Sequence, residues 1–186
     1  MIQVAFLGDS IRMQYAPKVG ELLGEEFSIF SSGDNGRYAK YTLRCLYDWQ
    51  GDMAGSRIVH WNNGLWDSCE LFGDGALFTS EEEYEATMLR IADILLSRYD
   101  RVIFATTTPV SPKNTFNKNE DIKRYNDRIV PLLRARGVWI NDLYSLVAQD
   151  LDAYICEDTI HLSEAGIACC AQAVTEVIRQ AAQQLT

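Results

Sequence analysis

The sequence predicts an α/β fold, a three-layer αβα sandwich built around a mostly parallel, five-stranded, flavodoxin-like sheet. Short apolar runs alternate with amphipathic stretches, which is the pattern of β-α-β units whose sheet is covered on both faces. The 186 residues are 47% apolar and contain no long polar tract, internal repeat or linker. We therefore expect residues 1–186 to form one domain with a substantial core.

Five apolar runs are short enough to be strands, and turn-forming or amphipathic segments separate them. The last run is the shortest and carries the weakest strand pattern. The predicted strands span residues 3–7, 27–31, 57–61, 101–106 and 138–140.

The stretches between and after these runs predict helices. Pro17 suits the first turn of a helix, where its missing N–H loses no partner, so we expect a helix over 16–23 and a turn over 10–15. Ser80 and the three glutamates after it form a capping box that opens another helix. Its buried stripe is expected to be Tyr84, Met88, Ile91 and Leu95. Further helices are expected over 38–49, 119–136 and 163–183.

The charge balance excludes two classes of partner. The chain has 17 lysines and arginines against 26 aspartates and glutamates, a net charge of −9. Because such a chain repels phosphate backbones and anionic lipids, we expect neither nucleic acid nor a membrane as partner. There is no run of 18 apolar residues and no signal-peptide pattern, so we expect a cytoplasmic location.

The cysteines indicate reduced thiols. Their number is odd, and they show neither a C-x-x-C motif nor a spacing typical of zinc ligands. We therefore predict no disulfide framework, no metal site and no cofactor. The five cysteines are Cys45, Cys69, Cys156, Cys169 and Cys170.

Candidate catalytic residues follow the predicted strands. Ser10 comes directly after the first strand, and two long loops, 67–79 and 107–117, follow later strands and are expected to line a site. A serine nucleophile needs a base, most often an imidazole oriented by a carboxylate. His60 lies inside a strand and is expected to be packed, whereas Asp158 and His161 share a polar turn before the last helix.

These motifs resemble those of the SGNH, or GDSL, hydrolase family. Gly8-Asp9-Ser10 matches the family's nucleophile motif, and the D-x-x-H of Asp158 and His161 matches its acid and base. The resemblance implies that Gly36 and Asn62 supply oxyanion donors. The family pattern G-x-N-D falls on H-W-N-N at residues 60–63, so this chain departs from it at His60 and Asn63.

The resemblance implies an esterase in which Ser10 attacks the ester carbonyl, His161 takes its proton and Asp158 stabilises the imidazolium. For Asp9 we favour a structural hydrogen-bonding role. Cys156 is a poor alternative nucleophile because it lacks an oxyanion glycine. The candidate substrate contacts near these motifs are Asp9, Arg12, Arg37, Trp61, Asn63 and Trp66, with Tyr38 as a further flanking aromatic residue.

The predicted substrate is a small acyl ester, with an O-acetyl group on a carbohydrate or polyol as the leading choice by analogy with the family. An O-acyltransferase with the same triad is an alternative, as is a non-catalytic carbohydrate-binding module. A flavodoxin-like nucleotide binder is disfavoured, because neither a G-x-G-x-x-G motif nor a P-loop lysine follows the first strand.

Overall fold

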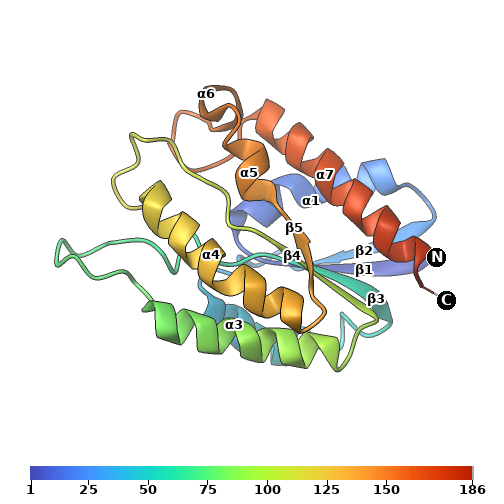
Figure 1. The fold of residues 1–186 in the computed structure, drawn as a ribbon. Helices are drawn as coiled ribbons and strands as arrows, with labels where there is room; N and C mark the ends of the chain where they lie inside the picture. The colour runs from blue at the N-terminus through green and yellow to red at the C-terminus, as the bar shows by residue number, and fades with distance from the viewer. Residues whose placement is uncertain (186) are drawn as a thin grey trace.

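The computed structural model describes residues 1–185 and contains a five-stranded sheet in the order β2-β1-β3-β4-β5, with every neighbouring pair parallel. The sheet and the helices on its two faces confirm the predicted three-layer fold (Figure 1). The strands are β1 (Ile2–Leu7), β2 (Phe27–Ser31), β3 (Ser56–Trp61), β4 (Arg101–Ala105) and β5 (Trp139–Asn141).

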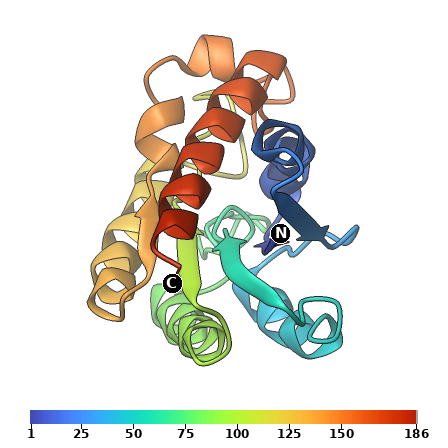
Figure 2. The ribbon, with the colours of Figure 1, turned by 90° about the vertical axis from the view of Figure 1, so that its right-hand side faces the viewer.

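The helices form two layers (Figures 1 and 2). One face of the sheet is covered by α1 (Ser10–Leu23) and α7 (Glu164–Gln183), with the short α5 (Leu143–Val147) and α6 (Leu151–Tyr154) packed on α7. The other face is covered by α2 (Ala39–Asp48), α3 (Glu81–Leu96) and α4 (Asn119–Ala135). Within residues 1–185, no helix combines the length and hydropathy needed for a membrane span.

Successive side chains of a strand point to opposite faces of the sheet, so each strand contributes to the hydrophobic cores on both faces. In β1, Val4 and Phe6 pack under α1 and α7, whereas Ala5 and Leu7 pack under the layer of α2 and α3. The predicted stripe of α3 is buried, and the Ser80 hydroxyl caps the helix by accepting a hydrogen bond from the Glu83 N–H.

The strand order places a topological switch between β1 and β3. The chain moves from β1 to β2 on one side and then returns to β3 on the other. In parallel sheets the crevice at the carboxyl ends of such strands is the usual place for a ligand. The segments that carry Ser10 and Asn62 both begin at this point.

The first helix differs from the prediction. Residues 10–15 are helical rather than a turn, and α1 runs through Pro17. Asp9 caps the helix by accepting from the Ile11 N–H at 3.0 Å, and Ile11 and Tyr15 are fully packed in the core. Burial of this face and the cap therefore outweigh the hydrogen bond that Pro17 cannot make. The other predicted bounds agree within one residue, and the short helices α5 and α6 were not predicted.

We expect Pro17→Ala to stabilise the protein. Pro17 is exposed, so its loss leaves no cavity, and alanine restores the missing helix N–H. Proline costs ~3 kcal/mol relative to alanine in a helix interior, partly offset by the stiffer unfolded chain, so we expect a gain of about 1 kcal/mol or more. Urea unfolding measures the change, with the exposed neighbour Lys18→Ala as control. A fall in stability for Pro17→Ala would contradict a continuous helix.

Candidate active site

Ser10 lies where β1 meets α1. Gly8 adopts a φ of 141°, Asp9 caps the helix, and Ser10 is the first helical residue. Its hydroxyl and N–H therefore lie at a helix N-terminus, where N–H groups lack intrahelical acceptors and favour negative charge. Glycine is required at position 8, because a Cβ there would lie 1.7 Å from Asn62 Oδ1.

The structure brings Ser10, His161 and Asp158 together. His161 Nε2 lies 2.8 Å from Ser10 Oγ, and His161 Nδ1 lies 2.6 Å from Asp158 Oδ2. The turn that carries both residues is held by Asp158 Oδ1, which accepts from the N–H groups of Ile160 and His161 at 3.0 and 2.9 Å. The carboxylate thus fixes both the backbone and the imidazole of the residue that faces Ser10.

Gln14 fastens this turn to the helix of Ser10 and was missed by the sequence reasoning. Its Oε1 accepts from the Leu162 N–H at 3.0 Å, and its Nε2 donates to the Leu162 carbonyl at 3.1 Å. Gln14 follows Ser10 by four residues, so both lie on one face of α1. That spacing is the only sequence signal that could have indicated it.

The ionisable groups near Ser10 have different environments. Burial raises the pKa of Asp158, but donors outweigh it: the His161 and Ile160 N–H groups, the His161 ring and the Cys156 thiol hold the pKa below its ordinary value. Burial raises the pKa of Asp9, against hydrogen bonds from Asn62 and Ile11. Asp158 is thus favoured as an anion beside His161, whereas burial opposes the charge of Asp9.

The other histidine is a core residue. His60 is fully buried among Phe6, Tyr15 and Asn141, and burial lowers its pKa to about 3. The imidazole is therefore neutral near pH 7. This agrees with the prediction that His60 is packed.

The two asparagines after β3 have separate environments. Asn62 Nδ2 donates to Asp9 Oδ1 at 2.9 Å, which occupies one of its two N–H groups. The Asn63 amide instead donates to the Arg37 carbonyl and to Thr42, and its oxygen accepts from Trp61 Nε1 at 2.7 Å. Of the two side-chain amides, only that of Asn62 binds Asp9, the residue next to Ser10.

The expected role of Gly36 needs correction. Its N–H donates to the Gly8 carbonyl at 2.8 Å and so does not face the space beside Ser10 as an oxyanion donor. A Cβ at Gly36 would lie 2.6 Å from the same carbonyl oxygen. Glycine at this position permits the close approach of two backbone segments.

Four of the candidate substrate contacts are buried and bind within the protein. Asp9, Arg12, Trp61 and Asn63 are at most 1% exposed, so no substrate reaches them in this structure. Trp61 packs against Phe104 in the core. Arg37 is exposed and stacks on Tyr41, Tyr38 packs on Phe78, and Trp66 is 40% exposed.

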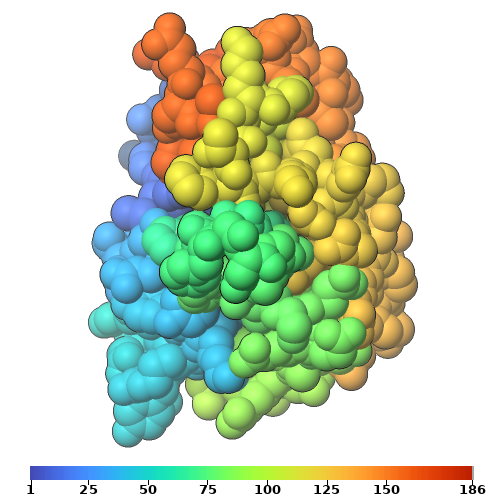
Figure 3. All heavy atoms as spheres, turned by 90° about the vertical axis from the view of Figure 1, so that its left-hand side faces the viewer, coloured from blue at the N-terminus to red at the C-terminus, as the bar shows by residue number. Residues whose placement is uncertain are grey.

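A cleft of about 310 Å³ opens beside Ser10, and both predicted loops line it. The backbones of the two loops pair in an antiparallel β-bridge between Cys69 and Asn117, and the Glu70 N–H donates to the Phe116 carbonyl. Figure 3 shows the green 67–79 segment against the yellow 107–117 segment on this face. The cleft is lined by Ser10, Leu65, Trp66, Cys69, Leu71, residues 114–117 and residues 158–160.

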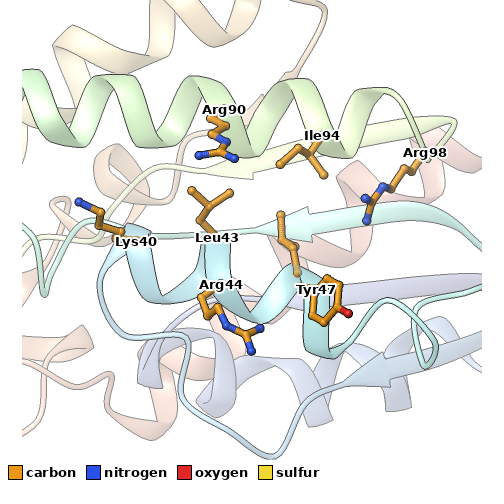
Figure 4. A pocket seen from close by; sticks show the side chains of 8 residues that line it. Lys40, Leu43, Arg44, Tyr47, Arg90, Ile94 and Arg98 are labelled. Atoms are coloured by element: carbon orange, nitrogen blue, oxygen red, sulfur yellow. The ribbon is translucent and has the colours of Figure 1, made fainter.

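A larger hollow of about 580 Å³ lies between α2 and α3, away from Ser10 (Figure 4). Leu43 and Ile94 line it, and basic side chains lie around them. It contains neither a serine nor a histidine, so it offers no nucleophile and base for the chemistry of Ser10. The basic residues are Lys40, Arg44, Arg90 and Arg98.

All five cysteines are free in the structure. Among residues 1–185, no three side chains of histidine, cysteine, aspartate or glutamate converge in a way that could hold a metal ion.

Comparison with known proteins shows a common fold at low sequence identity. No protein-family model and no curated protein matches the sequence. The acetyl xylan esterase AlAXEase has a TM-score of 0.77 at 18% identity over 95% of this chain and 100% of that chain. Axe2, an acetylxylan esterase from Geobacillus stearothermophilus, has a TM-score of 0.78 at 17% identity over 95% and 94%.

A member of the lipolytic G-D-S-L family from Veillonella parvula has a TM-score of 0.79 at 14% identity, over 97% of this chain and 100% of that chain. Similarity at this level of identity shows a shared architecture. The chain has the fold of the SGNH, or GDSL, hydrolases.

Proposed function

We propose that this protein is a carboxylic ester hydrolase with Ser10 as nucleophile, His161 as base and Asp158 as the carboxylate that orients it. The observation that carries the proposal is the hydrogen-bonded chain from Ser10 Oγ through the His161 ring to Asp158, with distances of 2.8 and 2.6 Å. This is the arrangement that makes a serine hydroxyl nucleophilic near neutral pH.

In the proposed reaction, His161 Nε2 takes the Ser10 proton as Oγ attacks the ester carbonyl. The same imidazole then gives the proton to the leaving alcohol, and water hydrolyses the acyl-enzyme. The oxyanion is stabilised by the Ser10 N–H at the start of α1 and by the second N–H of the Asn62 amide, whose first N–H binds Asp9.

The proposed substrate is a small acyl ester, an O-acetyl group on a carbohydrate or polyol. Its support is the fold shared with two proteins named acetyl xylan esterases. Assays with added alcohols distinguish hydrolysis from acyl transfer, because a transferase with the same triad yields a new ester in place of the free acid.

The two histidines should have opposite phenotypes. We expect Ser10→Ala and His161→Ala to lose nearly all activity on 4-nitrophenyl acetate, by ~10⁴-fold or more in kcat, with little change in melting temperature. His60→Ala should instead lower stability by ~2 kcal/mol or more, because it removes a buried ring. Esterase assays and thermal unfolding of the three variants test this.

The assignment fails if Ser10→Ala keeps more than about a tenth of the wild-type rate, since loss of a nucleophile removes the covalent route. An inactive but stable His60→Ala together with an active His161→Ala would show that the base has been misassigned.

The asparagine pair tests the oxyanion site. We expect Asn62→Ala to lower kcat by ~10² or more with little change in KM, because its donor strengthens as the carbonyl oxygen gains charge. Asn63→Ala is the matched control and should mainly reduce stability, by ~1–3 kcal/mol, because it leaves Trp61 Nε1 and the Arg37 carbonyl without a partner. A reversed pattern would move the donor to Asn63.

Gln14 is expected to act as a positioning residue. Gln14→Met keeps the volume but removes both hydrogen bonds to Leu162, so we expect kcat to fall ~10-fold with KM nearly unchanged, as the His161 turn loses its register with Ser10. Gln14→Glu keeps the acceptor for the Leu162 N–H but places an oxygen against the Leu162 carbonyl, so it should also lower kcat. Equal kcat in all three proteins, measured at saturating ester, would exclude the role.

A further inference from the structure

The cleft beside Ser10 offers few free hydrogen-bonding groups. Asn114 Oδ1 accepts from the N–H groups of Phe116 and Asn117, and its Nδ2 donates to Thr159 Oγ1 at 2.9 Å. The Asn117 amide donates to the Leu65 carbonyl at 2.8 Å, and both oxygens of Asp158 accept hydrogen bonds. The polar lining is therefore largely committed to the protein itself.

The surface that remains is apolar and accessible. Trp66, Leu71 and Phe116 line the cleft and are 40%, 45% and 56% exposed. Leu65 and Ile160 add aliphatic groups to the lining. Exposed apolar groups gathered around a reactive serine favour a ligand that covers them.

The charge of the cleft restricts the ligand further. Asp158 is the only ionisable carboxyl among its lining residues, and no lysine, arginine or histidine lines it. Its hydrogen bonds favour the charged form of Asp158, and the whole chain carries a net charge of −9. An anionic group in the cleft would therefore be repelled without a cation to bind it.

The position of the cleft indicates which part of an ester it receives. Residues 158–160 form one wall and lead directly into His161. In the proposed reaction the leaving oxygen must lie within hydrogen-bond reach of His161 Nε2 to receive its proton. The alcohol portion of the ester therefore lies on the His161 side, along this wall.

We propose that this cleft, defined by Trp66, Leu71, Phe116 and Ile160 beside Ser10, is a subsite for the alcohol portion of the ester, and that it selects uncharged alcohols with an apolar face. The inference rests on the proposed esterase function. An alkyl or aryl group and the C–H face of a sugar ring share this chemistry, and both pack on exposed aromatic side chains.

Isomeric esters distinguish binding of the alcohol portion from binding of the acyl portion. Hexyl acetate and ethyl hexanoate have the same atoms and differ only in which side carries the long chain, so bulk hydrophobicity is matched. Full burial of one methylene group raises binding affinity up to about fourfold. Hexyl acetate has four more methylene groups than ethyl acetate, so their partial burial predicts a kcat/KM about tenfold higher for hexyl acetate. Ethyl hexanoate should remain close to ethyl acetate.

The preference should depend on the cleft walls. We expect Trp66→Ala and Phe116→Ala each to reduce the hexyl-to-ethyl ratio of kcat/KM to below about threefold. Phe72→Ala is the matched control and should keep the wild-type ratio, because Phe72 follows Leu71 in the loop 67–79, is 78% exposed and does not line the cleft. A monoacetylated methyl glycoside tests whether the alcohol portion is a sugar. If the sugar ring packs on Trp66, Trp66→Ala should slow hydrolysis of this ester.

The outcomes separate the two proposals. Failure of the wild type to hydrolyse any of these esters would overturn the esterase function itself. Three results would overturn the alcohol subsite while the esterase function stands. They are equal hydrolysis of ethyl and hexyl acetate, faster hydrolysis of ethyl hexanoate than of hexyl acetate, and a preference for hexyl acetate that both Trp66→Ala and Phe116→Ala retain.

Discussion

Three loops meet at the backbone of Gly8, where a side chain of any size would collide with its neighbours. Its carbonyl accepts from the Gly36 N–H at 2.8 Å and from Arg12 Nη2 at 3.1 Å, and Asn62 packs against its Cα. The segments after β1, β2 and β3 are thereby fixed to one another at the switch point of the sheet. The positions of Ser10 and Asn62 follow from this close packing.

Buried polar contacts maintain the same junction. Arg12 is almost fully buried and donates from Nη1 to Ser31 Oγ and the Ser32 carbonyl, and from Nη2 to the Asp34 carbonyl. Burial of a guanidinium is costly unless hydrogen bonds offset it, and the bonds made by Nη1 and Nη2 of Arg12 hold the loop after β2 in one conformation. Residues beside the nucleophile motif thus serve the architecture, and the exposed loops farther along the chain supply the cleft walls.

The sequence was sufficient where one local pattern dominates, as in the apolar strands, the capping box at Ser80 and the motifs that contain Ser10 and His161. It was insufficient where tertiary contacts override local preference. Pro17 predicted a later helix start, but burial of the first turns of α1 prevailed. Arg12 was predicted as a substrate contact, because no short-range pattern reveals acceptors that lie 19 to 22 residues away. The Gly36 N–H was assigned by analogy, and only the fold reveals its partner.

The contact between Asp158 and His161 orients the imidazole and does little to stabilise the fold. The two side chains are 48% and 35% exposed, so water screens their attraction and the pair adds little to the stability of the fold. Because the pKa of Asp158 is lowered on folding, any such contribution exists above its unfolded pKa and is lost as the pH falls through the lower folded value. Asp158 therefore stays ionised through mildly acidic pH. In the proposed mechanism it remains an acceptor throughout the reaction: it orients the imidazole and stabilises the imidazolium, while the proton moves only among Ser10, His161 and the leaving alcohol.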